Sequence, residues 1–211
     1  MTDIKVPASS SSARGAPVRN RIIDTAERLL REGKAEFTMR DLAAEAGVSF
    51  ATPFNHFGSK ATIMHVLSAR RIDTMIQRFT GSPPLLDAAD RVLLAVSIAA
   101  KVMLEEPDVN RAVMGWLGTA GPSHGAVLAH STSLWAQALG DGEGLIERRW
   151  EQAQCYLPEQ FAFGFRGVLS FWTAGELPDA ALAAQTQEMA NTLLLGFSER
   201  QPDDRNRRKK R

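Results

Sequence analysis

The chain has 211 residues, of which 44% are hydrophobic and 23% are charged. This balance is typical of a soluble globular protein with one or two domains, and it argues against a large enzyme. The 25 basic and 24 acidic residues nearly cancel, so net charge alone neither favours nor excludes nucleic acid as a partner. Residues 1–80 carry 12 Lys or Arg and 8 Asp or Glu, residues 81–200 carry 7 and 14, and residues 201–211 carry 6 and 2. A basic front is therefore joined to an acidic body and a basic tail.

The single cysteine and the first residues indicate a cellular compartment. Cys155 cannot close a disulfide within the chain, and no apolar signal stretch follows Met1, so we expect the reducing cytoplasm. The longest uncharged run, residues 112–140, has 29 residues, but its glycines, histidines and serines and Pro122 would not be tolerated in a membrane-spanning helix. We expect no membrane partner, and instead two uncharged helices that meet at residues 121–122.

The first 80 residues contain a series of helix start and stop signals. Residues 1–18 are rich in Ser, Pro and Gly and predict a disordered arm. Apolar residues at helical spacing predict a helix from Arg19 to Gly33. Thr38, followed three residues later by Asp41, is a capping-box pattern that predicts a second helix from about residue 39. The following glycine and Ser49 predict a tight turn and a third helix, so the pattern indicates a helix-turn-helix.

The remainder of the chain also shows helical periodicity. Ser59 is expected to cap a fourth helix that runs to about residue 79. Beyond Pro84, periodic segments at 85–106, 108–119, 123–139, 158–175 and 179–198 predict an all-α protein. Residues 141–157 fit either a surface helix or an irregular loop, and 201–211 are expected to be a disordered basic tail.

Four short motifs resemble the DNA-binding domain of the tetracycline-repressor-like (TetR/AcrR) family of bacterial regulators. They are IIDTA at 22–26, FTMRDLA at 37–43, AGVS at 46–49 and FGSK at 57–60. The resemblance implies an N-terminal three-helix helix-turn-helix domain at residues 19–66. It also implies a C-terminal helical domain at 67–200 for ligand binding and dimerisation, although that part matches the family only in length and class.

The resemblance also implies a set of DNA contacts around the third helix. A recognition helix presents small or polar side chains at its N-terminal end, where base edges can be reached. The residues expected to touch bases are Arg40, Phe50, Ala51, Thr52 and Phe54, and those expected at the backbone are Thr38, Asn55, His56 and Lys60, with Ser49 at the same helix start.

Two of these positions depart from the family pattern. Phe54 stands where a Tyr is usual, so no phenolic hydrogen bond is available. Phe50 stands where Lys, Arg or Gln is common, and it could only contact a thymine methyl. For Phe54, core packing and DNA contact remain open alternatives, and Phe57 is expected in the core. Lys60 lies at the start of the fourth helix, where backbone amides also attract phosphate.

No catalytic or metal-binding pattern is visible in the sequence. There is no Gly-rich phosphate loop, and the four histidines show no zinc-like spacing, so we expect no enzyme activity, no cofactor and no metal. His124 and His130 are expected to be hydrogen-bonded in the core or a pocket. The pair Arg70 and Arg71 is expected to be solvated.

The helix predicted after Pro158 is apolar on nearly all sides, so its second face needs a cover, most simply a twofold-related copy. The resemblance implies a dimer through the last two helices, which we assign to Phe165, Leu169, Trp172, Met189, Leu193 and Phe197. Bulky adaptable side chains are expected around a pocket for an apolar or aromatic effector, namely Met103, Met114, Trp116, Trp135, Phe163 and Phe171. The alternative is that they fill a solid core.

Arg166 is the only charged residue between Gln160 and Gly175. An unpaired buried charge is unfavourable, so it should either pair with an acid such as Glu159 or Glu188 or hold an anionic effector at the pocket wall.

The resemblance implies a ligand-responsive regulator, most simply a homodimeric repressor that binds a palindromic double-stranded DNA operator and is released by a small molecule. Two alternatives remain: a ligand-independent dimeric DNA-binding protein, and a helical small-molecule enzyme.

Overall fold

The computed structural model describes residues 11–117 and 125–198, with side chains from residue 16 onward. Regular structure in these residues is helical, apart from one isolated bridge between Leu145 and Ser198. The predicted all-α class is therefore confirmed. The helices are α1 (Ser11–Arg31), α2 (Met39–Glu45), α3 (Ala51–Phe57), α4 (Lys60–Thr80), α5 (Ala88–Glu105), α6 (Pro107–Trp116), α7 (Ala126–Leu139), a 3-10 turn (Glu147–Arg149), α8 (Trp150–Thr173) and α9 (Asp179–Leu194).

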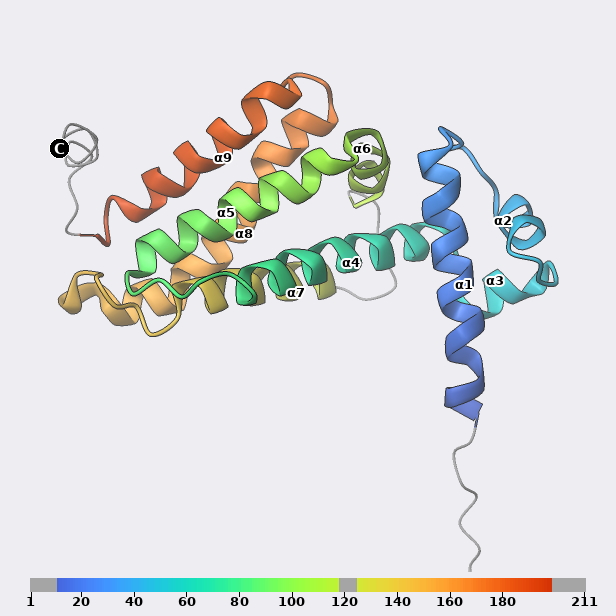
Figure 1. The fold of residues 1–211 in the computed structure, drawn as a ribbon, viewed down its shortest axis with the longest axis horizontal. Helices are drawn as coiled ribbons and strands as arrows, with labels where there is room; N and C mark the ends of the chain where they lie inside the picture. The colour runs from blue at the N-terminus through green and yellow to red at the C-terminus, as the bar shows by residue number, and fades with distance from the viewer. Residues whose placement is uncertain (1–10, 118–124, 199–211) are drawn as a thin grey trace, which may run out of the picture.

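The helices form two groups. Figure 1 shows α1, α2 and α3 at one end of the molecule and α5, α7, α8 and α9 at the other, with α4 extending from the first group into the second and α6 between them. Each group has its own apolar core, because the amphipathic helices bury one stripe each. We call the first group the N-terminal domain and the second group, with most of α4, the body.

The N-terminal core is completed by α6, the helix between the two groups. Its centre is formed by Ile22, Leu42, Ile63 and Leu67, all fully buried. Val109 and Val113 of α6 pack into the same core. A movement of α6 would therefore displace the helix-turn-helix directly.

Local capping signals set the start of two helices as predicted. The Thr38 hydroxyl accepts a hydrogen bond from the Asp41 backbone at 3.2 Å, and the Asp41 carboxylate accepts one from the Thr38 backbone at 2.8 Å. The Asp41 carboxylate accepts hydrogen bonds from the Thr38 backbone and from the Thr38 hydroxyl, and these lower the pKa of Asp41 because they stabilise its charged form. Ser59 accepts a hydrogen bond from the Thr62 backbone and caps α4 in the same way.

Two helix starts differ from the sequence expectation. The first helix begins at Ser11 rather than Arg19, so the expected disordered arm is wrong for residues 11–18, where Val18 already packs against the N-terminal core. Residues 1–10 and 201–211 lie outside the described residues. Residues 121–122 and His124 lie there too.

The second difference concerns α8. It begins at Trp150 and passes through Pro158, so part of the ambiguous segment 141–157 is helical and the expected start after the proline is wrong. An internal proline disfavours a helix by about 3 kcal/mol. Burial of Ala153, Leu157 and Phe161 on the two sides of this position outweighs that penalty.

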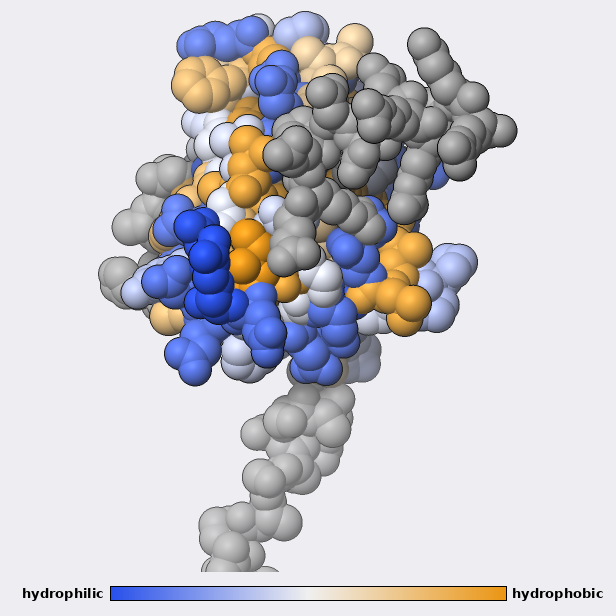
Figure 2. Space-filling view, turned by 90° about the vertical axis from the view of Figure 1, so that its left-hand side faces the viewer, coloured by the Kyte–Doolittle hydropathy of each residue, from blue (hydrophilic) through white to orange (hydrophobic). Residues whose placement is uncertain are grey.

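The body core is centred on large aromatic and aliphatic side chains. Trp135, Phe161 and Trp172 are buried almost completely, and Trp135 contacts the rings of Phe161 and Phe165. Figure 2 looks onto the end of the body farthest from the N-terminal domain, where apolar residues lie scattered among hydrophilic ones. Within the described part of the chain, no helix is both long and apolar enough to cross a membrane.

Candidate functional site

The turn between α2 and α3 is short because a glycine adopts the backbone conformation that the turn requires. Gly47 has φ +62°, a left-handed conformation that residues with a Cβ rarely adopt. After it, the expected cap of α3 is not formed: Phe50 already has helical dihedral angles, and no side chain caps the helix. The Ser49 hydroxyl instead lies 2.7 Å from the Thr52 hydroxyl. This pair fixes the Thr52 side chain at the start of α3.

The two faces of α3 differ sharply. Pro53 and Phe57 are buried beneath it, which confirms the core role of Phe57. With 3.6 residues per turn, Ala51, Thr52 and Asn55 lie on the opposite face. Exposed side chains flank this face on both sides, contributed by Phe54 and His56.

An aromatic pair extends this surface toward α2. Phe50 is 53% exposed and Phe54 is 41% exposed, and their rings meet edge to face at 5.4 Å. The Arg40 guanidinium lies 5.3 Å from the Phe50 ring. Exposed Phe54 is therefore not a core residue. Large apolar side chains that stay in water without a partner usually mark a binding surface.

Lys60 is held in a different place from the one expected. Its ammonium donates a hydrogen bond to the Ala35 carbonyl at 2.6 Å and lies 4.3 Å from the Phe37 ring and 5.2 Å from the Trp116 ring. Burial lowers the pKa of this amine, because it disfavours the charged form. In this conformation Lys60 links the start of α4 to the segment between α1 and α2 and to Trp116 of α6.

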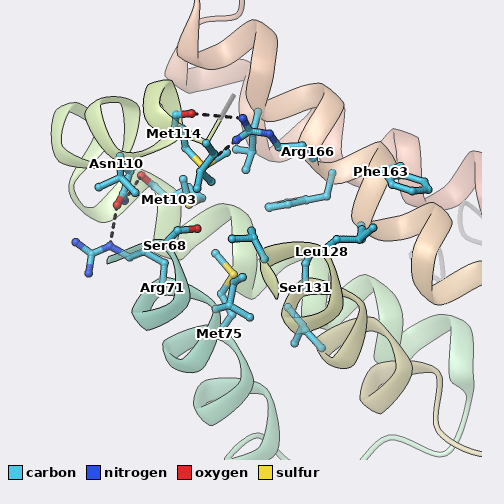
Figure 3. A pocket seen from close by; sticks show the side chains of 18 of the residues that line it. Ser68, Arg71, Met75, Met103, Asn110, Met114, Leu128, Ser131, Phe163 and Arg166 are labelled. Carbon is cyan, nitrogen blue, oxygen red and sulfur yellow. Dashed lines mark hydrogen bonds between the residues drawn. The ribbon is translucent and has the colours of Figure 1, made fainter. Parts of the chain in front are cut away.

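The second candidate site is a cavity of about 290 Å³ in the body. Its wall is formed by α4, α5, α6, α7 and α8 and is mainly apolar (Figure 3). The principal side chains that line it are Ile72, Met75, Met103, Val113, Met114, Leu117, Val127, Leu128, Leu134, Trp135, Phe165 and Leu169, with Ser68, Arg71, Asn110, Ser131 and Arg166 as polar members.

Four of the six residues expected at the cavity do line it, namely Met103, Met114, Trp135 and Phe163. Phe163 stands at one edge, apart from the others (Figure 3). Trp116 and Phe171 do not line the cavity. Trp116 packs against the N-terminal core, and Phe171 is 59% exposed on the outside of α8.

The expected dimer face of α8 is also corrected. Phe165, Leu169 and Trp172 are buried in the body of their own chain, so they cannot form the outer surface. The opposite face of α8, with Phe163 and Phe171, is the exposed one. A helix that is apolar on both sides does not reveal which side faces its own core.

The expected interface residues Met189 and Leu193 of α9, and Phe197 just after it, are partly buried against the body core and partly at the surface. Met189 and Leu193 pack closely on α8, since a Cβ at Gly164 would lie 2.7 Å from the Met189 sulfur and 3.7 Å from a Leu193 methyl carbon.

Charged residues join the body to the N-terminal domain. Arg71 of α4 forms ion pairs with Glu27 of α1 at 2.7 Å and with Glu106 at 3.4 Å, and it donates to the Asn110 side chain at 2.8 Å. Arg31 of α1 also binds Glu106 and thereby lowers the pKa of that carboxyl. We call these five residues the junction network.

The ion pairs of Arg70 and Arg71 correct an expectation. Arg70 and Arg71 were expected to be solvated, but Arg70 pairs with Asp24 at 2.6 Å and Arg71 is only 14% exposed. Nearby, His130 of α7 lies 2.9 Å from the Asp73 carboxylate of α4, so it has a hydrogen-bonding role, at a partly exposed site.

Arg166 of α8 lies in the cavity wall. Its guanidinium meets the Met114 sulfur and the Met114 carbonyl, each at 3.4 Å. The expected pairing with Glu159 or Glu188 is not formed in the structure, whereas the cavity position is. Burial lowers the pKa of Arg166, because the loss of water disfavours its charged form.

Comparison with known proteins gives matches to the N-terminal domain and to the fold of the chain. Residues 22–67 match the family model described as bacterial regulatory proteins, tetR family. A TetR transcriptional regulator from Rhodococcus sp. RHA1 superposes with a TM-score of 0.70 at 21% identity, covering 85% of this chain and 97% of that chain. The chain has the TetR fold. The resemblance predicted from the four motifs is therefore confirmed.

Two further solved structures share the TetR fold. A putative TetR-family transcriptional regulator from Mesorhizobium loti MAFF303099 has a TM-score of 0.53 at 16% identity, covering 88% of this chain and 98% of that one. The TetR family repressor AlkX from Dietzia sp. strain DQ12-45-1b has a TM-score of 0.55 at 22% identity, with 83% and 94% covered. No curated protein matches the chain significantly.

Sequence reasoning missed several residues of both sites. Arg19 of α1 is exposed, and its guanidinium lies 5.0 Å from the Phe57 ring at the end of α3. Asn110 and Ser131 line the cavity without having been expected there. For Asn110 a signal existed, because a polar residue on the apolar stripe of a helix, away from its caps, must find buried partners.

Proposed function

We propose that this TetR-fold protein is a transcriptional regulator that binds operator DNA through α3 and the preceding turn. The observation that carries the proposal is the exposed face of α3, where Ala51, Thr52 and Asn55 project beside the aromatic pair of Phe50 and Phe54. Small and hydroxyl side chains can reach base edges in the major groove, and an aromatic ring can contact a thymine methyl. Arg40, held beside Phe50, supplies the positive charge.

Backbone contacts would come from the edges of this surface. Thr38, Ser49, Asn55 and His56 offer hydroxyl, amide and imidazole groups to phosphate oxygens. Exposed Arg19 is placed next to the end of α3 and is added to the set. Lys60 is left out, because its ammonium is bonded to the Ala35 carbonyl.

The test of DNA binding uses a duplex selected from a random library by the purified protein. Thr52→Ala should weaken binding to the selected duplex by about tenfold, since one lost base contact is worth about 1–3 kcal/mol, and should leave binding to random DNA unchanged. Thr80→Ala at the far end of α4 is the matched control and should have no effect. An equal loss on both duplexes for Thr52→Ala would show that it reads no base, and absence of any selectable duplex would contradict the proposed function.

We further propose a homodimer formed by the exposed faces of α8 and α9. Support comes from Phe163 at 48% and Phe171 at 59% exposure on one side of α8, next to partly exposed Met189 and Leu193 on α9. A symmetric partner would bury this apolar surface. Two α3 helices would then read two half-sites about one DNA turn, or a few turns, apart.

The dimer is tested by sedimentation of the full chain at micromolar concentration. Phe171→Glu should produce monomers, because it would bury two charges at the twofold interface. Leu86→Glu, at an apolar residue that is 90% exposed between α4 and α5, should remain dimeric. A monomeric unaltered protein would contradict this part of the proposal.

The body cavity favours a ligand-responsive regulator over a ligand-independent one. A volume of about 290 Å³ is close to the lower end of known ligand sites, which is about 300 Å³. Val113 and Arg71 line the cavity and also bind the N-terminal domain, Val113 through its core and Arg71 through Glu27. A ligand that displaces α4 or α6 would therefore change the orientation of α3 and release the DNA. The repressor description of AlkX agrees with this sign of regulation.

A further inference from the structure

The two arginines of the cavity wall differ in how their charge is compensated. Arg71 has Glu27, Glu106 and Asn110 as partners, and Figure 3 shows its guanidinium directed toward Asn110 and away from the cavity centre. Arg166 has only the uncharged Met114, and it forms no ion pair with the described side chains. Among the described residues, the first arginine is therefore paired with acids of the protein, and the second has no acidic partner.

The hydrogen-bonding capacity of Arg166 is also largely unused. A guanidinium carries five N–H donors in a plane. The two contacts to Met114 are long, at 3.4 Å, and one of them is to a thioether sulfur, which is a weak acceptor. A half-buried cation with so few acceptors is unfavourable without water or an anion.

The rest of the wall recognises an apolar body. Met75, Met103, Leu134 and Trp135 line the cavity, and these flexible or flat side chains adapt to an alkyl chain or a ring. Ser131 accepts a hydrogen bond from the Trp135 indole at 3.3 Å and keeps its own proton to donate. In Figure 3, Arg166 lies at the side of α6 and α8, and Met75 and Ser131 lie across the cavity from it.

We propose that the cavity binds an apolar monocarboxylate, with the carboxylate held by Arg166 and the apolar body extending toward Met75 and Ser131. This inference rests on the effector role proposed for the cavity. A planar carboxylate matches the guanidinium in two parallel hydrogen bonds. A single charge on the ligand matches the single uncompensated charge of the wall, whereas a phosphate dianion would leave one charge without a partner.

The experiment measures binding to the full-length protein by calorimetry, without DNA. The probes are hexanoate, decanoate and tetradecanoate, each compared with the alcohol of the same chain length. At least one acid should bind about tenfold or more tightly than its alcohol, as expected for a charge-assisted bidentate contact. Arg166→Met should abolish this preference and leave alcohol binding within about twofold, because only the charged contact is removed.

Two further variants make the result specific. Arg166→Lys keeps the charge but loses the paired donors, so it should retain only part of the preference. Arg78→Met removes an arginine of the same body that pairs with Glu105 outside the cavity, and it should behave as the unaltered protein. If Arg166→Met does not fold, a reduced preference of Arg166→Lys for the acid over the alcohol still tests whether Arg166 binds the carboxylate.

Several results would overturn the inference. They are equal binding of acid and alcohol, failure of every acid to bind, or an acid preference that survives Arg166→Met. The proposed function fails separately. A protein that selects no duplex but binds decanoate through Arg166 would refute the DNA-binding role alone. If decanol releases a selected duplex as well as decanoate does, only the proposed requirement for a carboxylate on the ligand is refuted.

Discussion

The two sides of the cavity are built on different principles. On the side of α4 and α6, Arg71 and Asn110 have partners within the protein: Arg71 pairs with Glu27, and Asn110 donates to the Val102 and Met103 carbonyls at 3.1 and 2.9 Å. On the side of α8, Arg166 forms no ion pair with the residues that the structure describes. A satisfied network holds two elements in one arrangement, whereas an unsatisfied group can respond to a ligand. The first side therefore serves the connection to α1 and the second serves recognition.

Exchanging each arginine for methionine tests this difference most strongly. Arg71→Met should lower the free energy of unfolding by about 3 kcal/mol, because it leaves the nearly buried Glu27 without its closest cation. Arg166→Met should leave stability unchanged or slightly raised, since it removes an uncompensated charge. Denaturant unfolding at neutral pH measures both. Equal losses for the two variants would contradict the distinction between the two sides.

Asn110 should show the next largest effect. It is 1% exposed, and Asn110→Ala would leave the Val102 and Met103 carbonyls and the Arg71 guanidinium without this partner. We expect a loss of about 2 kcal/mol, in the range for unsatisfied buried polar groups. Ser131→Ala, at a cavity-lining residue of α7, is the comparison, and thermal unfolding should show little change for it. A stable Asn110→Ala variant would mean that water replaces the amide.

Lys60 gives an intermediate case, because this cation is held by a carbonyl and two rings. Lys60→Met should lower stability by about 1 kcal/mol through loss of the hydrogen bond to Ala35 and of the ring contacts. The salt dependence of DNA affinity should remain that of the unaltered protein. A salt slope that becomes shallower by about one unit would instead place Lys60 at a phosphate, as the sequence motif predicts.

The smallest effect concerns acid pH. The hydrogen bond from Arg31 holds the pKa of Glu106 below its usual range in the folded protein. The stabilisation by the charged Glu106 carboxylate is therefore present above its unfolded pKa of about 4.3. It is lost as the pH falls through the lower pKa of Glu106 in the folded protein. Glu106→Gln should reduce the fall in stability below about pH 5. Glu147→Gln, outside the junction network, should leave the curve unchanged, and an unaltered curve for Glu106→Gln would argue against the network.

Much of the N-terminal domain could be predicted because its signals are local. The capping box of Thr38 and Asp41, the glycine turn and the Ser59 cap each act within a few residues, so the chain itself specifies where α2 and α4 begin. The motifs also identified the exposed residues of α3. They did not indicate that the Lys60 ammonium bonds to the Ala35 carbonyl, because that carbonyl lies 25 residues earlier in the chain.

The sequence alone determined the all-α class, the helix-turn-helix and the apolar character of α8, because these follow from periodicity and short-range caps. Only the tertiary structure decided which face of α8 turns inward. Phe165 and Trp172 lie on one apolar face and Phe163 and Phe171 on another, and both faces satisfy the same 3.6-residue pattern. Residues distant in sequence likewise decided which arginine forms an ion pair. Arg71 found Glu27, which precedes it by 44 residues, and Arg166 found no acid at all among the described residues.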